Sequence, residues 1–418
     1  MTPTILVLLG GLSLILVGIG LLGTLLGVRA TLASFADLEI GLIMAGYYAG
    51  YIAGTVLAPR LIRNVGHIRC FAAFAALASA ATLGFGLLVN PYAWLGLRVL
   101  NGICVVGLYM VVESWINEQT AGPGRGRVFA LHMMSTLVAL ALGQTLLLAG
   151  DSSSLTLFAF AAVLISLGVI PVAVTRVTEP RIDVSMRVRL PQLLRASPLG
   201  VMGALSAGTV NGAFWGMAPV FGQRLPLEEP QIVQLMSATI IGGALLQWPI
   251  GHLSDRLDRR IVLILTSLAT ATVALIAGYV VIEGQSGLIP YAFLYGGLMF
   301  SLYGISVAHT NDQLEQGQAL EATRGLLLIY GIGALCGPVV AGLAMEGAGP
   351  VGLPAMSAAT AGLLALFGLY RMARRPAPPV ADQTGFVPLV RTSPVVLEML
   401  PAADQSAEID ANTPTPGS

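Results

Sequence analysis

Apolar and polar positions alternate on a long scale along the chain. Twelve stretches of about 20 mostly apolar residues are separated by polar loops. A helix of that length crosses the roughly 30 Å hydrocarbon layer of a bilayer, whereas the strands of a membrane barrel would change polarity at every second residue. The pattern therefore predicts an all-α membrane protein with twelve transmembrane helices, at residues 5–28, 40–58, 70–89, 92–115, 128–149, 155–174, 199–221, 232–250, 261–282, 288–308, 325–345 and 351–370.

A polar, arginine-bearing interruption divides the spans into two sets of six. We expect an N-terminal six-helix half at residues 1–175, a cytoplasmic connector at 176–198 and a C-terminal six-helix half at 199–371. Residues 372–418 are rich in Pro, Ala, Ser, Asp and Thr. That composition cannot bury enough apolar surface to fold, so it predicts a disordered cytoplasmic tail.

The two halves are similar where their fourth spans end. Asn117-Glu118-Gln119 and Asn311-Asp312-Gln313 stand at corresponding positions, and each is followed by an arginine-bearing loop. This is a weak parallel repeat. Transporters built from two such pseudo-symmetric halves bind their substrate near the midplane of the membrane, between the halves.

Charge predicts the orientation of the spans. The chain is 56% hydrophobic, only 10% charged and has no net charge, which gives no sign of a nucleic-acid partner. It contains no lysine, and its arginines gather in the loops after the even-numbered spans, while Arg29 and Arg224 stand on the other side with acids such as Asp37. By the positive-inside rule both termini are cytoplasmic. We therefore expect a multi-pass protein of the cytoplasmic (inner) membrane, with lipid around it.

The sequence gives no indication of a cofactor, a metal site or an enzyme. The three cysteines lack metal-ligand spacing, and His67, His132, His252 and His309 are dispersed. No nucleotide-binding P-loop is found, so active transport would draw on an ion gradient, for which protons are the natural choice. The N-terminal apolar run is too long for the core of a signal peptide.

The loop after span eight reads Gly251-His252-Leu253-Ser254-Asp255-Arg256-Leu257-Asp258-Arg259-Arg260. It resembles the loop signature of the major facilitator superfamily, which has a Gly, three residues, Asp-Arg, one residue, a Gly and two basic residues. Gly251 would let helices approach, and Asp255 would cap a helix and pair with an arginine. We expect Gly251, Asp255, Arg256, Arg259 and Arg260 to form a latch that breaks as the halves rock. Retention of positive charge on the cytoplasmic side is the alternative, and it explains the arginines alone.

The two copies of this loop differ from the family signature in different ways. Asp258 stands where the family has Gly, so we expect the geometry of that turn to differ from the family's. The corresponding loop after span two has Arg63 in place of the acid, so the latch of the first half is degenerate.

Span four carries charged residues within its apolar run. Arg98, Asn101 and Gly102 are similar to the family's Arg-x-x-polar-Gly signature, and Glu113 lies nearer the cytoplasmic end. A charge within the hydrocarbon layer costs several kcal/mol, so it normally faces a cavity or a partner. We consider Arg98 a substrate-binding or proton-coupling group and Glu113 a titrating acid. Alternatively, Arg98 snorkels to the outer face and Glu113 lies in interfacial water.

Neutral polar and aromatic side chains recur in the spans that would line a central cavity. Together they favour an aromatic, mostly uncharged cavity, although each residue alone could instead connect neighbouring helices. The candidates are Tyr47, Tyr51, Gln144, Asn211, Trp215, Gln247, Tyr295 and Tyr303.

Within the superfamily the chain resembles the YcaD-like branch. The resemblance rests on Gly46-Tyr47-Tyr48-Ala49-Gly50, Glu113-Ser114-Trp115-Ile116-Asn117 and Gln247-Trp248-Pro249-Ile250-Gly251, and covers the chain up to the tail. It implies a transporter, and we expect a secondary transporter of a small solute that works by alternating access as a monomer. The aromatic cavity favours export of amphipathic compounds, while Arg98 would suit import of a small organic anion. A receptor that does not transport is a third reading, because fold alone is weak evidence of function.

Overall fold

The fold is known from a computed structural model that describes residues 3–120, 125–175, 190–225, 227–284, 287–314, 318–374 and 386. These residues form helices joined by short loops, and no strand occurs among them. The prediction of an all-α fold is confirmed. Residues 176–189 of the expected connector and nearly all of the expected tail lie outside the described residues.

The first half consists of spans that run up and down the bundle. Span six is divided because Pro171 has no N–H to donate to the Leu167 carbonyl, where its first helix ends. The helices are α1 (Pro3–Leu32), α2 (Asp37–Val65), α3 (His67–Leu87), α4 (Pro91–Gln119), α5 (Arg125–Thr145) with the 3-10 turn η2 (Leu146–Ala149), α6 (Thr156–Leu167) and α7 (Val169–Val174).

The second half follows a short helix, α8 (Leu190–Ala196). Its spans are α9 (Pro198–Arg224), α10 (Glu229–Arg256), α11 (Arg259–Ile282), α12 (Leu288–Asn311), α13 (Ala319–Ala348) with the 3-10 turn η3 (Gly349–Val351), and α14 (Gly352–Arg374). Several helices extend beyond the predicted apolar stretches, because hydropathy marks only the part of a helix that crosses hydrocarbon.

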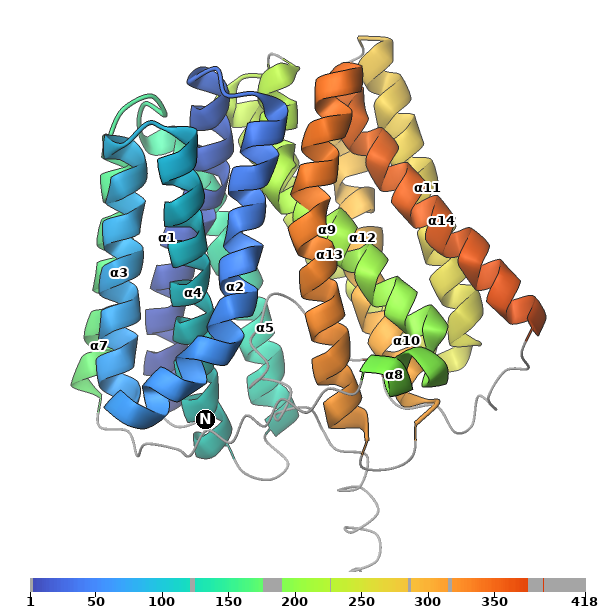
Figure 1. Cartoon of the computed structure of the whole chain (residues 1–418), viewed down its shortest axis with the longest axis horizontal. Coiled ribbons are helices and arrows are strands. Elements are labelled where there is room, and N and C mark those ends of the chain that lie inside the picture. The colour runs from blue at the N-terminus through green and yellow to red at the C-terminus, as the bar shows by residue number, and fades with distance from the viewer. Residues whose placement is uncertain are drawn as a thin grey trace, which may run out of the picture.

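Ten segments of the described chain are long and apolar enough to cross a membrane. The last of them, Ala319–Arg374, holds α13 and α14, which run in opposite directions in Figure 1 and make two crossings. Helix α9 falls outside the ten segments. Most of its residues are buried against other helices, so it needs less apolar surface toward lipid. With α9 the described helices make the twelve predicted spans.

The same three helix pairings recur in each half. In the first half α1 packs on α5, α2 on α4 and α3 on α6, and in the second half α9 packs on α13, α10 on α12 and α11 on α14. Glycines bring the paired backbones into contact: a Cβ on Gly102 would collide with the Tyr47 carbonyl, and one on Gly296 with the Thr239 carbonyl. The pairings support the parallel repeat that the sequence predicts.

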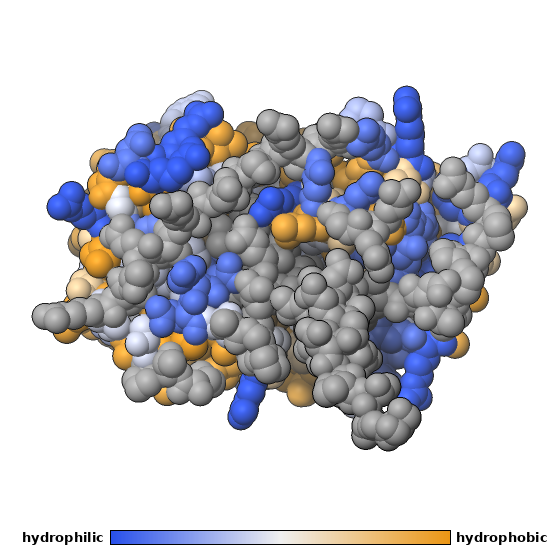
Figure 2. Space-filling model, turned by 90° about the horizontal axis from the view of Figure 1, so that it is seen from below, coloured by the Kyte–Doolittle hydropathy of each residue, from blue (hydrophilic) through white to orange (hydrophobic). Residues whose placement is uncertain are grey.

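Figure 1 shows the two halves side by side, with α1–α7 on the left and α8–α14 on the right. They meet through α2 with α13, α1 with α9 and α5 with α10. We call the lower end of Figure 1 the arginine-rich end, because Arg60, Arg63, Arg256 and Arg324 lie in its loops and helix ends, and the upper end the arginine-poor end. Figure 2 shows hydrophilic residues on the arginine-rich end over both halves.

The tightest contacts between the halves lie toward the arginine-poor end. A Cβ on Gly41 of α2 would collide with the Pro338 carbonyl of α13, and one on Gly342 would collide with the Asp37 carbonyl. From there α2 and α13 diverge toward the arginine-rich end in Figure 1. Among the described residues, this conformation is therefore closed at the arginine-poor end.

Candidate functional site

A small pocket lies where the two halves meet. It holds four of the candidates from the sequence, Tyr47, Arg98, Gln144 and Trp215, and it draws on both halves. The space open to the centres of water molecules is about 20 Å³, room for about one water. We call it the central pocket, and its lining is Ile19, Gly20, Gly23, Thr24, Tyr47, Arg98, Leu140, Gln144, Trp215 and Met236.

Arg98 of α4 gives the central pocket its charge. Its side chain is 7% exposed, and its guanidinium carbon lies 5.0 Å from the centre of the Tyr47 ring, a cation–π distance. Its Nη2 also donates to the Met44 sulfur at 3.5 Å. None of the ten lining residues is acidic. The pocket therefore combines a buried positive charge with aromatic walls.

Gln144 of α5 has its amide fully engaged. The Thr24 hydroxyl donates to Gln144 Oε1, and Gln144 Nε2 donates to the carbonyls of Gly20 and Leu140, each at 3.2 Å. These bonds connect α5 to α1 and fix which way the amide points. Gln144 therefore shapes the wall of the central pocket and leaves Arg98 as its polar centre.

Three other candidates lie outside the lining of the central pocket. Asn211 of α9 donates to the carbonyls of Ala207 at 2.9 Å and Met299 at 3.5 Å, so it connects α9 to α12. Tyr295 donates to the Ser357 hydroxyl at 2.9 Å in a separate pocket of the second half. The ring centre of Tyr51 lies 5.9 Å from that of Tyr47, so the two rings pack against each other.

The remaining neutral candidates are buried in helix contacts. Tyr303 packs its ring 4.8 Å from that of Tyr330. Asn101 is fully buried one turn from Arg98, and neither its amide nitrogen nor its amide oxygen has a hydrogen-bond partner among the described residues. The Gln247 amide nitrogen is likewise buried without a described partner. Polar groups of this kind are normally hydrogen-bonded, so both amides are available to bond a polar ligand atom or a water.

Glu113 of α4 pairs with a residue that the sequence analysis set aside. Its Oε1 lies 3.2 Å from His132 Nε2 of α5, and both side chains are fully buried. The signal was present in the spacing: α4 and α5 stand on either side of residues 121–124, and Glu113 and His132 are at nearly equal distances along the chain from them. Residues so placed in a helical hairpin lie at one level of the bundle.

The predicted latch lies at the arginine-rich end of the second half. Arg259, whose side chain is 1% exposed, donates to Asp255 and to Asp312, each at 3.1 Å. This links α10, α11 and α12, and Asp312 is a member that the motif did not reveal. Every one of these residues belongs to the second half. In this conformation the cluster braces that half, and a role across the halves stays a prediction.

The helix cap in this loop is Asp258 and not Asp255 as we expected. Asp258 accepts from the Arg260 backbone N–H at 3.0 Å and pairs with the Arg260 side chain at 2.7 Å. Burial raises the pKa of Asp258, but these bonds outweigh it and hold the pKa below its usual value. Its φ of −56° requires no glycine, which explains how the turn departs from the family signature.

Gly251 and Asp255 also contact a residue beyond the last span. The Phe386 backbone N–H donates to Asp255 at 2.8 Å, and its ring lies where a Cβ on Gly251 would be. Arg256, the fifth residue of the predicted latch, ends α10 with its side chain exposed. The group that approaches Gly251 closely is therefore a side chain, and the role of Gly251 in a latch stays a prediction.

An ion pair joins the halves at the arginine-poor end. Arg224, in the last turn of α9, donates to Asp37 Oδ1 from Nε at 2.9 Å and from Nη2 at 2.8 Å. Arg224 also donates to the Phe35 carbonyl at 3.3 Å. Both charged residues were recognised in the sequence only as loop charges, because their pairing depends on how the halves pack. The pair seals the end at which the halves are in contact.

The chain matches the family model of the Major Facilitator Superfamily over residues 4–323 and 201–403. It is 29% identical over 349 residues to the MFS-type transporter YcaD of Salmonella arizonae, covering 82% of this chain and 90% of that protein. It is 28% identical over 384 residues to YcaD of Escherichia fergusonii, covering 91% and 98%.

Solved structures with the same fold are transporters. The nucleoside transporter NupG, in a mutant form, superposes with a TM-score of 0.75 at 15% identity, covering 88% of this chain and 99% of that one. A bacterial homologue of the human lysosomal transporter Spinster, inward-facing and occupied, gives 0.71 at 15% identity over 92% and 99%. The chain is thus a multi-pass membrane transporter for a small molecule, not an enzyme, and it belongs to the major facilitator superfamily, where it is similar to the YcaD transporters.

Proposed function

We propose that this secondary transporter exports amphipathic compounds in exchange for protons. The central pocket carries the proposal, because both halves contribute to it and it pairs one buried arginine with aromatic rings. An amphipathic solute would place its apolar part on Tyr47 and Trp215 and an acceptor or anionic group on Arg98. Import of a small organic anion is the second candidate, and Arg98 favours it.

The charge distribution supports cytoplasmic termini. The arginine-rich end would then face the cytoplasm, and the described conformation would be closed toward the outside. Labelling of single cysteines from outside intact cells tests this: Asn64→Cys and Leu257→Cys should be protected, and Asp151→Cys and Glu283→Cys should react. The opposite pattern would overturn the orientation.

The Glu113–His132 pair supports coupling to protons. A buried carboxylate beside an imidazole can take up and release a proton, and in hydrocarbon a change of charge strongly alters which helix arrangement is preferred. In proteoliposomes, Glu113→Gln should make transport insensitive to an imposed pH gradient while transport down a solute gradient continues. Retained proton dependence would remove Glu113 from the coupling step.

Direction can be measured once a ligand is known. We would screen the purified protein for thermal stabilisation by a panel of amphipathic compounds and small organic anions over a range of pH. Hits are then followed in everted and right-side-out vesicles. Export predicts accumulation in everted vesicles that are acidic inside, and import predicts accumulation in right-side-out vesicles. Stabilisation without movement in either would favour the receptor, and would overturn the transport proposal.

A further inference from the structure

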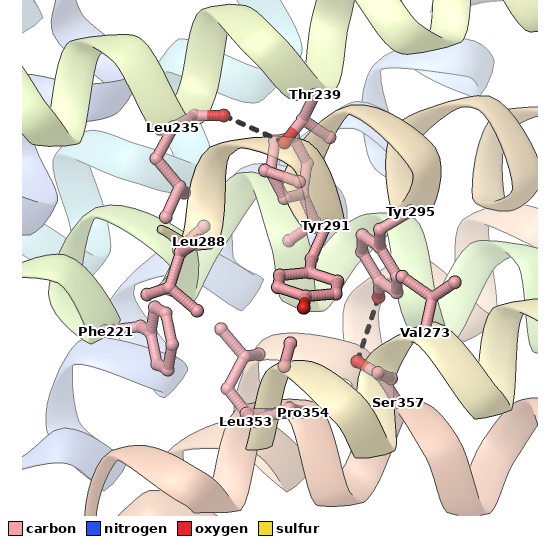
Figure 3. Close-up of a pocket in the computed structure, with 15 residues that line it drawn as sticks. Phe221, Leu235, Thr239, Val273, Leu288, Tyr291, Tyr295, Leu353, Pro354 and Ser357 are labelled. Atoms are coloured by element: carbon pink, nitrogen blue, oxygen red, sulfur yellow. Dashed lines mark hydrogen bonds between the residues drawn. The ribbon is translucent and has the colours of Figure 1, made fainter. Parts of the chain in front are cut away.

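A second pocket lies wholly within the C-terminal half (Figure 3), and it shares no lining residue with the central pocket. We call it the side pocket. Its space open to the centres of water molecules is about 80 Å³, against about 20 Å³ for the central pocket. Five helices, α9, α10, α11, α12 and α14, surround it. The lining is Phe214, Ala218, Phe221, Leu235, Thr239, Val273, Ala274, Ala277, Leu288, Tyr291, Ala292, Tyr295, Leu353, Pro354 and Ser357.

The chemistry of the side pocket favours an uncharged, apolar occupant. None of its lining residues is charged, and most are aliphatic or aromatic. The Thr239 hydroxyl donates to the Leu235 carbonyl at 2.9 Å, and the Tyr295 hydroxyl donates to Ser357 at 2.9 Å, as the dashed lines of Figure 3 mark. A cavity lined in this way holds water poorly and binds hydrocarbon well. A charged substrate or a lipid headgroup would lose its solvation there without replacement.

The position of the side pocket places it within one leaflet. Leu235 lies in the second turn of α10, Leu288 begins α12, and Leu353 lies in the first turn of α14. All three are close to the arginine-poor ends of their helices. The side pocket is therefore at the depth of the acyl chains in the leaflet on that side.

The side pocket is continuous with the lipid-facing surface. Its lining residues on α9, α10 and α14 are buried, and those that keep partial exposure, such as Val273 and Tyr291, all lie on α11 and α12. Exposed apolar side chains adjoin them on the same two helices, Ile276 at 40% and Ile289 at 43%. In a membrane protein these exposed residues face lipid. Lipid chains are thus the apolar species present at high concentration on the open side.

We propose that the side pocket binds an acyl chain of a phospholipid from the leaflet at the arginine-poor end, with entry between α11 and α12. The chain packs against Phe221 and Phe214 on the far wall. This site depends on the membrane embedding of the fold, and not on the substrate or the direction of transport. A failed transport assay would leave it standing.

The side pocket and the central pocket share their dividing walls. Phe214 faces the side pocket and its neighbour Trp215 lines the central pocket, with ring centres 5.2 Å apart. Leu235 and Met236 of α10 are divided in the same way. The ring of Phe300 packs against both, with its centre 6.3 Å from the ring centre of Phe214 and 6.1 Å from that of Trp215. An acyl chain in the side pocket would therefore contact residues whose direct neighbours in the sequence line the central pocket.

Quenching of tryptophan by brominated phosphatidylcholine tests the proposal, because bromine quenches only at short range. The reporter is Phe221→Trp, which is buried on the far wall and 6% exposed in the native protein. The background carries Trp248→Phe, since Trp248 is 75% exposed, and Trp215→Phe, since the Trp215 ring centre lies 5.2 Å from that of Phe214 in the side pocket. The remaining tryptophans, Trp94 and Trp115, are buried. The matched control is Phe158→Trp, a fully buried phenylalanine of the first half that lines neither pocket.

The reporter should lose as much fluorescence in brominated vesicles as the native Trp248 does, and the control should lose almost none. Narrowing the entry with Ala277→Leu should then reduce quenching of the reporter to the level of the control. If that variant misfolds, Ala292→Leu narrows the pocket from α12. Quenching of Phe221→Trp no greater than that of Phe158→Trp, or quenching unchanged by both leucine variants in folded protein, would overturn the site.

Discussion

The two halves share their helix pairings but bury their charges in different places. In the first half Arg98, Glu113 and His132 are buried within the spans, in addition to Asp37 and His67 at helix ends. In the described part of the second half, the buried arginine and histidine side chains, Arg259, Arg260 and His309, lie at the arginine-rich end. A charge held in hydrocarbon costs several kcal/mol and persists where it has a function. The comparison indicates that the first half carries the ionic chemistry and the second supplies aromatic walls and a brace.

The largest expected effect is on the cluster of Asp255, Arg259 and Asp312, which we call the brace because it links α10, α11 and α12. Asp312→Asn removes one of the two acids that face the buried Arg259, and should lower the free energy of unfolding by about 3 kcal/mol. Thermal unfolding in detergent measures this. Glu321→Gln, an exposed acid of the same half, loses the same charge and should change little. Equal melting temperatures for the two variants would mean that the brace does not stabilise the half.

Next in size is the loss of the central arginine. Arg98→Ala should weaken binding of the identified ligand tenfold or more, because hydrogen bonds to a charged group contribute about 1.5–3 kcal/mol. Arg98→Lys should retain part of the affinity. Arg260→Ala removes a buried arginine of the second half, and should lower stability without altering affinity. If Arg98→Ala and Arg260→Ala weakened binding alike, the claim that only the first half supplies charge for ligand binding would be wrong.

A smaller effect is expected where the halves touch. Asp37→Asn breaks the pair with Arg224, which is about a third exposed, so the loss is about 1 kcal/mol or about fivefold in the balance between closed and open states. Met44→Cys, buried below this contact, should then react faster with a thiol reagent added at the arginine-poor end. The double exchange Asp37→Arg with Arg224→Asp should restore slow labelling. Fast labelling in the exchanged protein would argue against a gate.

The smallest effect concerns the cap of α11. Asp258→Gly restores the family residue but removes the pair with Arg260, at a cost of less than about 1 kcal/mol. The pKa of Asp258 is depressed in the folded protein, so its contribution is present above its ordinary pKa and is lost as pH falls through the folded value. The melting temperatures of variant and parent should therefore differ at neutral pH and converge below about pH 4. A difference in melting temperature that persists in acid would mean that the glycine destabilises through its backbone freedom, and not through loss of the carboxylate.

The sequence was sufficient to predict what depends on local pattern. Each span is visible because about 20 apolar residues are needed to cross the bilayer, and Arg98 is conspicuous because a charge interrupts such a run. The family signature also indicated the loop in which Asp255, Arg259 and Arg260 lie. Helix ends were less predictable, since α2 continues past the apolar stretch to Val65.

What the sequence did not reveal depends on packing between distant segments. Asp37 and Arg224 are 187 positions apart, and nothing local links them. His132 was set aside although it and Glu113 stand at nearly equal distances from residues 121–124, because that spacing indicates a contact only once α4 and α5 are seen to pack as neighbours. The placement of Tyr295 in the side pocket was missed for the same reason, since span membership does not say which side of a helix faces the central pocket.

The shared wall between the pockets has a thermodynamic consequence. Because Phe214 and Trp215 are consecutive on α9, a rotation of that helix changes both pockets at once. If lipid and substrate each favour one orientation of α9, then each must change the affinity of the other by the same factor, a reciprocity that holds for any pair of coupled equilibria. Membrane composition would then act on this transporter as an effector does, and affinities measured in one lipid would not transfer to another.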